Sequence, residues 1–397
     1  MLRKAVTFGF LVSILFIFTV GTGYAEKVKG VTEDTIKIGV IEDLTGPVAA
    51  IGIPVSEAHK NYFRNINEKN GIHGRRVKLV VEDTGYTIPR AIAGFKKLLY
   101  RDQVFAILGP GSTGETVALL SQIEKKKVPT ISLSCAEAIT YPFKRYVFTH
   151  FATYENSTKL VFDYVIKDLK KKKPRVAIVY TDNEMGKSSL RGARSAAKFY
   201  SLELVREEIL NLTDTDATSQ ALNLKKAKAD YVIVAGAVPT AVSILKDSKR
   251  FGFSPVFFGT YATVDEAVIR MVGNAARNWF VLFCYGLWDD ESPGIVEMKR
   301  ITYKYHPDSK KRSGFYTMGW TMAIIMAEGM KRAGRDLSRE GLVDGIESIK
   351  DFDTKGVTGI LDYSSTSHRG GEEVAIFKAD LKKNSYKRIT DWKKPSF

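Results

Sequence analysis

The residues best suited to chemistry lie in one glycine-rich segment, Leu108–Thr116, with the sequence LGPGSTGET. We expect this segment to join a strand to a helix. Its glycines let backbone approach a ligand, Ser112 and Thr113 supply hydroxyls, and a helix N-terminus carries positive potential. The segment therefore favours a ligand with a carboxylate group. An ordinary turn with Ser or Thr as the N-cap has the same composition, so only its place at the carboxyl end of a strand favours a binding site.

Enzyme signatures can be tested on the same chain, and they fail. Gly186–Ser188 resembles the end of a P-loop, but Thr181 stands where the first glycine of that motif belongs. Around Ser112 the nucleophile-elbow pattern is broken, because Pro110 occupies its first glycine position. Glu82-Asp83 is a lone acidic pair that we expect at a strand end. The sequence predicts no catalytic residue and no enzyme.

Metal and redox sites are equally poorly supported. The five histidines are His59, His73, His150, His306 and His368. No two of them are four residues apart, which is the spacing that would place two metal ligands on one face of a helix. The two cysteines, Cys135 and Cys284, match no metal or redox spacing. Each lies near an apolar run, which favours two buried thiols, although the sequence leaves a disulfide open. We expect no metal and no cofactor.

The N-terminus has the order of a secretory signal peptide. A short basic patch, Met1–Lys4, precedes an apolar run, 5–20, and a small-residue stretch that ends at Ala25. The run is near the lower length limit for a retained membrane anchor, and no charged stop follows it. No cysteine stands at the junction, which disfavours a lipoprotein. We expect cleavage after about Ala25 and export of a soluble protein to the periplasm.

The chain is basic, with 60 Lys and Arg against 44 Asp and Glu, a net charge of +16. Cleavage would remove only Arg3 and Lys4 and would leave +14. The densest clusters, Lys125–Lys127 and Lys170–Lys173, fall where helices are expected to end, and lysine there complements the helix dipole. Nucleic-acid binding would need interleaved aromatic residues or a known motif. A solvated basic surface and no nucleic-acid partner are the expectation.

The hydrophobic pattern alternates short strands with longer amphipathic helices, which predicts parallel sheets covered by helices on both faces. The first series has strands at 35–41, 77–82, 105–108 and 130–133, and helices at 54–67, 88–101 and 116–126. The second has strands at 175–180, 203–210, 231–235, 256–259 and 279–283, and helices at 156–169, 187–200, 217–226, 241–251 and 265–272. Helices at 294–305, 316–333 and 339–348 and strands at 359–361 and 374–378 follow.

The trailing elements are too few for a third domain, so they should complete the first two. This predicts a first lobe of residues 26–150 plus 287–357 and a second lobe of 151–286 plus 358–397. The chain would cross between the lobes near 148–153, 284–289 and 355–363. Three crossing strands make a hinge, and a hinged cleft can trap a ligand.

Several segments resemble one known family. Thr35–Val40, Leu44–Pro47, Gly52 and Asn65–Gly74 are similar to the opening of the leucine/isoleucine/valine-binding proteins, the type I periplasmic substrate-binding proteins of branched-chain amino acid ABC transporters. The similarity continues through Glu82-Asp83, Gly109-Pro110, Val128–Ser132, Tyr146–Phe148, Val176–Val179 and Phe251-Gly252, across nearly the whole mature chain. It implies two flavodoxin-like lobes with a three-crossover hinge, a monomer, and a membrane permease as partner.

The resemblance also implies a ligand site. In amino-acid-binding members, the ligand carboxylate meets a hydroxyl at the position that aligns with Thr113, beside Ser112, and the loop that aligns with Ser134-Cys135-Ala136. Thr113 keeps this hydroxyl, whereas Ala136 replaces the usual threonine and loses one contact.

The ammonium side departs from the family pattern. Tyr261 aligns with the acidic residue that binds the ammonium, and the aromatic residues that often line the cleft align with Ile51, Met185 and Ala237. A buried ammonium without a counter-charge is costly. The resemblance thus favours a carboxylic acid with an apolar or aromatic body, although Asp182 or Glu184 could still serve an amino group.

We therefore expect a transport receptor that closes around its ligand and performs no chemistry. A ligand-sensing protein of the same fold, which regulates a membrane sensor, is the first alternative. An enzyme is the second, and the missing catalytic sets disfavour it.

Overall fold

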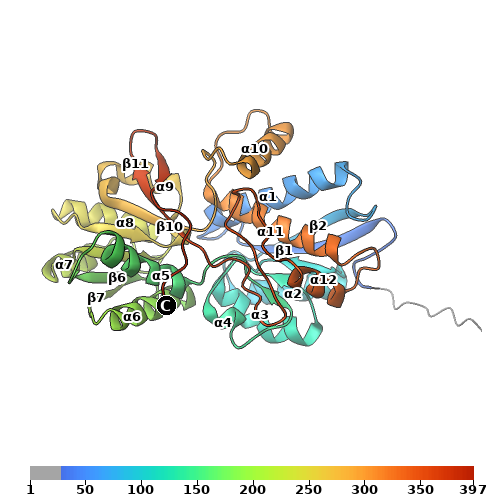
Figure 1. Ribbon diagram of the computed structural model, residues 1–397, viewed down its shortest axis with the longest axis horizontal. Helices are drawn as coiled ribbons and strands as arrows, with labels where there is room; N and C mark the ends of the chain where they lie inside the picture. Colours follow the sequence, from blue (N-terminus) through green and yellow to red (C-terminus); the bar gives the residue numbers. More distant parts are fainter. Residues whose placement is uncertain (1–27) are drawn as a thin grey trace, which may run out of the picture.

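The computed structural model describes residues 28–397, and these build two sheets, each with its own helices (Figure 1). The first sheet contains β1 (Thr35–Glu42), β2 (Arg76–Asp83), β3 (Ala106–Leu108), β4 (Thr130–Ile131) and β5 (Val147–Phe148). Its order is β2-β1-β3-β4-β5, and every pair is parallel. The last five residues of β1 are buried, because helices cover both faces of a parallel sheet.

The helices of the first lobe come from two distant parts of the chain. The early ones are α1 (Ala49–Glu68), α2 (Ile88–Lys96) with a π-helical extension η1 (Lys97–Arg101), α3 (Thr113–Lys126) and α4 (Glu137–Thr140). The late ones are α10 (Pro293–Tyr305), α11 (Gly314–Arg332) and α12 (Arg339–Glu347). α11 packs against both α1 and α12, so the trailing helices join the first lobe (Figure 1).

The second sheet is larger and has a mixed edge. It contains β6 (Val176–Tyr180), β7 (Leu204–Ile209), β8 (Tyr231–Ala235), β9 (Val256–Gly259), β10 (Trp279–Phe283), β11 (Ala375–Asp380) and β12 (Ser385–Arg388), in the order β12-β11-β10-β9-β8-β6-β7. β6 to β10 pair in parallel, whereas β11 is antiparallel to both β10 and β12. The predicted parallel architecture is confirmed except at this edge.

The helices of the second lobe fill the connections between its strands. They are α5 (Tyr154–Asp163), η2 (Tyr164–Asp168), α6 (Glu184–Phe199), α7 (Thr218–Lys226), α8 (Val238–Arg250), η3 (Tyr261–Thr263), α9 (Glu266–Val272) and η4 (Gly273–Asn278).

Several expectations about individual elements are wrong: the helices expected from 116, 187 and 241 begin three residues earlier, and β12 was not predicted. Residues 359–361 form no strand, and Leu361 makes only an isolated bridge with Phe352. The first helix begins at Ala49 rather than at Pro54, because the turn before the proline packs onto the end of β1. A Cβ on Gly52 would lie 2.0 Å from the carbonyl oxygen of Asp43, so the backbones are in direct contact there.

Three chain segments connect the lobes, and the last one passes the hinge twice. The first two leave β5 and β10. The third, between α12 and β11, first pairs Thr358 with Tyr285 and later pairs Arg369 with Thr149 (the red segment between the lobes in Figure 1). The hydroxyl of Tyr363 also donates to the Thr149 carbonyl at 3.0 Å. The lobe boundaries proposed from the sequence remain a prediction.

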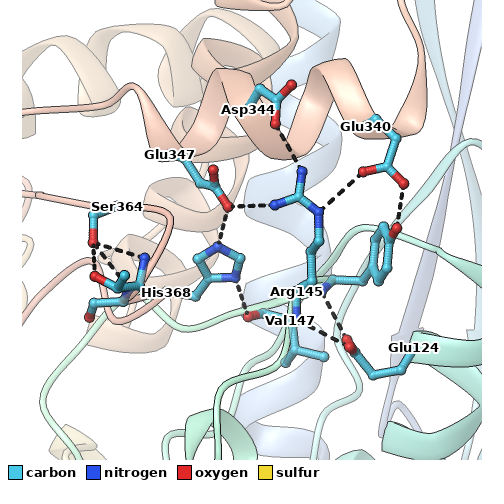
Figure 2. Close-up of polar contacts among 11 residues, drawn as sticks. Glu124, Arg145, Val147, Glu340, Asp344, Glu347, Ser364 and His368 are labelled. Atoms are coloured by element: carbon cyan, nitrogen blue, oxygen red, sulfur yellow. Dashed lines mark hydrogen bonds and ion pairs between the residues drawn. The ribbon is translucent and has the colours of Figure 1, made fainter.

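A cluster around Arg145 fastens α12 and the third segment to the start of β5 (Figure 2). The Arg145 guanidinium donates to Glu340 at 3.2 Å, Asp344 at 3.0 Å and Glu347 at 3.2 Å. His368 lies 2.9 Å from the same Glu347 carboxylate oxygen, and its ring stacks on Phe148 with centroids 3.9 Å apart. We call Arg145 and its three acidic partners the Arg145 cluster.

Within residues 28–397, no helix combines the length and apolar character needed to cross a membrane. The predicted signal peptide, 1–25, lies outside the described residues.

Candidate ligand-binding site

The residues predicted to bind ligand all follow the carboxyl end of a strand, where parallel sheets hold their ligands. They lie after β1 (Ile51), β3 (Ser112, Thr113), β4 (Ser134, Cys135, Ala136), β6 (Met185), β8 (Ala237) and β9 (Tyr261). Each exposes at most 8% of its surface. The predicted residues thus lie at the carboxyl ends of the strands in both sheets. Within the described chain, only some of them form hydrogen bonds through their side chains.

The loop from Gly109 to Ser112 sets the start of α3. Gly109 has φ of 101°, and a Cβ there would lie 2.2 Å from the Ile41 carbonyl oxygen, so glycine is required. Ser112 is the N-cap, and its hydroxyl accepts from the Glu115 backbone N–H at 3.2 Å. The capping role considered from the sequence is therefore confirmed for Ser112. The next residue, Thr113, keeps its hydroxyl free of the cap.

A chain of three hydroxyls connects the lobes. The Thr113 hydroxyl of the first lobe lies 3.1 Å from the Tyr154 hydroxyl, which lies 3.0 Å from the Tyr261 hydroxyl. The two tyrosine rings are stacked, with centroids 5.4 Å apart and an interplanar angle of 7°. Phe151 packs against Tyr261 with centroids 5.0 Å apart. We call Thr113, Tyr154 and Tyr261 the hydroxyl chain.

Sequence reasoning missed Tyr154. A signal was present, because Thr153 caps the helix that Tyr154 begins, and its hydroxyl accepts from the Asn156 N–H at 3.1 Å. A capped helix that starts just after a crossover strand presents its first residue to the cleft, but nothing in the local pattern says which partner that residue meets.

Burial keeps the hydroxyl chain protonated. It raises the pKa of Tyr261 well above its ordinary value, and the neighbouring Tyr154 and Cys135 raise it further. The pKa of Tyr154 is raised for the same first reason. Two neutral phenols and one alcohol are hydrogen-bond donors, and a carboxylate accepts such bonds strongly.

Further hydroxyls in the facing loops lack protein partners. Within residues 28–397, the buried side-chain oxygens of Ser134 and Thr260 have no hydrogen-bond partner. Such groups carry a desolvation cost unless a guest or water pairs with them. Ser134, predicted from the sequence, thus retains a hydrogen-bonding capacity that a ligand can use.

The acidic residues that could have served an amino group in the second lobe are already paired. Asp182 lies 2.7 Å from Lys187, and Glu184 lies 2.7 Å from Arg191. Arg191 also reaches the buried Glu155 at 3.2 Å. These ion pairs hold both acids on the surface of α6.

A second pair of acids lies buried in the first lobe, and sequence reasoning missed both. Glu42 ends β1 and is fully buried, and Glu115 in the first turn of α3 exposes 1% of its surface. Within the described chain, their carboxyl oxygens have no hydrogen-bond partner. Burial raises the pKa of Glu42 well above its ordinary value, and Glu115 raises it further. Burial also raises the pKa of Glu115.

Cys135 and Cys284 are both buried free thiols, as the apolar surroundings predicted. Burial raises the pKa of each thiol, that of Cys284 to about 12. No set of three or more His, Cys, Asp or Glu side chains in residues 28–397 is arranged to hold a metal ion.

Comparison with known proteins identifies the family. The family model described as periplasmic binding protein matches residues 35–385. Leu/Ile/Val-binding protein homolog 3 of Brucella melitensis is 23% identical over 373 residues, which cover 93% of this chain and 96% of the relative. The leucine-specific-binding protein of Salmonella typhimurium is 21% identical over 329 residues, covering 81% and 86%.

Solved structures share the fold. A fatty acid ABC transporter substrate-binding protein from Thermomonospora curvata superposes with a TM-score of 0.84 at 24% identity, covering 93% of this chain and 94% of the other. A branched-chain amino acid ABC transporter protein from Thermus thermophilus, with bound valine, has a TM-score of 0.85 at 23% identity, covering 92% and 98%. The predicted two-lobed fold is confirmed. The chain belongs to the periplasmic binding protein family.

Proposed function

We propose that the protein is the periplasmic receptor of an ABC importer and that it captures a small carboxylate-bearing ligand between its lobes. The hydroxyl chain carries this proposal. Thr113 belongs to one lobe and Tyr154 and Tyr261 to the other, so a carboxylate that takes the place of the two hydroxyl–hydroxyl bonds would accept from both lobes at once. Such a ligand would stabilise the closed arrangement, which is the form that a permease can recognise.

The ligand we favour lacks an amino group and has an apolar or aromatic body. Tyr261 is a neutral donor where amino-acid-binding relatives carry an acid, and Asp182 and Glu184 are engaged in ion pairs. The predicted cleft walls at Ile51, Met185 and Ala237 offer no charged group. One of the structures that share the fold is a fatty acid ABC transporter substrate-binding protein. This likeness supports a carboxylic acid without an amino group as the ligand.

An amino acid is the second candidate, and the buried Glu42 and Glu115 favour it. Burial raises the pKa of Tyr86 to about 12, with Glu115 as the next cause, and Tyr86 in turn contributes to the raised pKa of Tyr261. Glu115 thus acts on Tyr86, and Tyr86 on Tyr261, so the three side chains lie in one buried region. In this alternative the ammonium would favour ionisation of Glu115 or Glu42, and that carboxylate of the first lobe would be its counter-charge.

A thermal-shift and calorimetric screen of the refolded, ligand-stripped mature protein tests both candidates. The screen should pair aliphatic and aromatic carboxylic acids with their methyl esters and with the corresponding α-amino acids, because a ligand that binds only the native state raises Tm. Stabilisation by the acids but not by their esters supports our proposal. Stabilisation by leucine-like amino acids alone overturns the ligand assignment, and its loss in Glu115→Gln would then establish the second candidate.

We further propose that the protein is exported after cleavage near Ala25 and acts as a monomer with a membrane permease. The family assignment supports this partner, and the two lobe surfaces flanking the cleft would form the docking face. A sensory role would instead require a membrane sensor as partner. Reconstituted transport of the bound acid, with the permease encoded beside this gene, decides between the two roles.

A further inference from the structure

Two adjoining hollows lie on the second lobe and are lined by basic residues. The first has a volume of about 600 Å³, and the second, of about 350 Å³, shares Phe253, Ser254 and Pro255 with it. Their cationic side chains come from four separate segments and are Lys171, Lys172, Lys173, Lys225, Lys249 and Arg277. We call these residues the basic face. All of them are exposed.

The basic face lies away from the ligand site. Its hollows are formed where strands begin, at Pro174 just before β6, at Tyr231 of β8 and at Val256 of β9. The residues of the candidate site lie where the same strands end. A strand of five residues spans roughly 16 Å, so the two surfaces occupy opposite edges of one sheet.

The charge of the basic face is not neutralised within residues 28–397. None of its six cations forms an ion pair there, and the one acidic residue that lines the hollows is Asp230, whose carboxylate accepts from the Arg175 backbone N–H at 3.0 Å. Lys225 donates only to the Phe251 carbonyl, at 2.8 Å.

Helix-dipole complementation explains only part of this surface. Lys225 and Lys249 lie in the last turns of α7 and α8, where a cation stabilises the helix. Lys171–Lys173 lie beyond the end of η2, and Arg277 belongs to a short 3-10 segment. The helix dipole falls off beyond the last turn, and a short 3-10 segment has a weak one, so these four residues gain less from a helix end, yet they line the same two hollows.

We propose that the basic face docks the protein on the anionic phospholipid surface of a membrane. Lysine-rich surfaces gain attraction to anionic lipid headgroups with each cation brought near the bilayer. The cations are spread over several elements on flexible side chains, which suits a diffuse layer of phosphates. Nucleic acid is a poorer fit, because the aromatic residues of the hollows, Tyr231, Phe253 and Phe257, are buried or half-buried rather than available for base stacking.

The face leaves the hinge and the cleft free. Docking would therefore concentrate the receptor at the membrane that holds its permease and would not require a change in ligand affinity. The inference is independent of which ligand is bound.

Co-sedimentation of the mature protein with vesicles tests the docking. Vesicles of phosphatidylglycerol and phosphatidylcholine should bind it at about 50 mM salt and release it at about 0.5 M, because screening shortens the reach of the charges. Vesicles of pure phosphatidylcholine should not bind it. Equal partition onto both kinds of vesicle overturns the proposal.

A matched pair of variants locates the surface. Lys171→Gln, Lys172→Gln, Lys173→Gln and Lys225→Gln combined should lower the partition coefficient at least about tenfold. The control removes four exposed lysines of the first lobe that have no ion pair in the described chain, through Lys60→Gln, Lys78→Gln, Lys96→Gln and Lys125→Gln. It should stay within about twofold of the parent, because these charges lie off the basic face.

Equal losses in the two variants would mean that net charge alone drives binding and would overturn a localised face. Inorganic phosphate, added at constant ionic strength, separates a bilayer from a small-anion site. Release of the protein from vesicles by phosphate alone would overturn membrane docking, whereas retention supports it. Unchanged ligand affinity and Tm in both variants confirm that the fold is intact.

Discussion

The hydroxyl of Tyr154 lies 3.0 Å from that of Tyr261, with the two rings nearly parallel, although 107 residues separate them in the chain. Tyr154 also meets Thr113 of the other lobe at 3.1 Å. The Tyr154 side chain therefore connects the lobes. Its hydroxyl is hydrogen-bonded to Thr113 of the first lobe, and its ring stacks on Tyr261 of the second lobe. This relationship is the basis of the first prediction.

Replacing Tyr261 with Phe should weaken ligand binding and leave the fold unchanged. The variant keeps the stacked ring but loses one hydrogen-bond donor to the carboxylate, which costs about 1–3 kcal/mol, or roughly 5- to 150-fold in Kd. Titration calorimetry with the acid selected by the screen measures this. Tyr164→Phe, in the same lobe but with no hydrogen bond from its hydroxyl to the described residues, is the control. An unchanged Kd in Tyr261→Phe would exclude the phenol from carboxylate recognition.

Replacing Glu42 with Gln should stabilise the protein at neutral and alkaline pH. Burial raises the pKa of Glu42, so the folded state holds a proton that the unfolded state releases above its ordinary pKa of about 4.5. The free energy of unfolding therefore falls as pH rises from 4.5 through the folded-state pKa. Glutamine removes this loss, with an expected gain of about 1 kcal/mol or more at high pH.

Urea denaturation between pH 4 and pH 8 measures the effect of Glu42→Gln. The gain should vanish below pH 4.5, where both states are protonated. Glu203→Gln, at an exposed carboxyl of the second lobe, serves as the control for the loss of one carboxyl group. A stability difference for Glu42→Gln that is constant with pH would contradict a buried neutral carboxyl.

Replacing Arg145 with Met should destabilise the first lobe. The change leaves Glu340, Asp344 and Glu347 close together without their shared cation, so like charges repel on one face of α12 (Figure 2). We expect a loss of about 1–2 kcal/mol in the free energy of unfolding, more than for an isolated surface pair. Arg194→Met, which breaks a single exposed pair with Glu207, is the matched control and should cost about 0.5 kcal/mol.

Equal losses in the two arginine variants, measured by chemical denaturation, would show that the Arg145 cluster is no stronger than one surface ion pair. Hydrogen exchange on the Arg145 variant should locate the weakened protection in α12 and around His368, which shares Glu347.

Thiol titration should find both cysteines unreactive in the native protein and reactive after denaturation. Cys135 and Cys284 are buried, and burial raises the pKa of each thiol, so little thiolate forms at pH 8. Reaction with an aromatic disulfide reagent, followed by its absorbance, should report two thiols per chain in denaturant. If the denatured protein reacts with the reagent only after it has been reduced, the two cysteines form a disulfide. That result would contradict the structure.

The sequence alone determined the alternation of strands and helices, because buried strands and amphipathic helices leave local hydrophobic periods of their own. It also indicated that a Ser or Thr of the segment after β3 caps a helix and that Thr113 follows a strand at the edge where ligands bind; the structure assigned the cap to Ser112. The start of α1 was misplaced, because Pro54 signals a helix start locally whereas contact between Gly52 and Asp43 is a tertiary effect.

Only the tertiary structure decided which of these edges meet. The pairing of Tyr154 with Tyr261, the burial of Glu42 beside α3, and the second hinge contact at Arg369 join residues that are far apart in the chain. So does the gathering of Lys171–Lys173 with Lys225 around one hollow. Local periodicity reports which face of an element is apolar, but not which element will cover it. That choice depends on how strands order within a sheet and how the lobes close, which long-range packing sets.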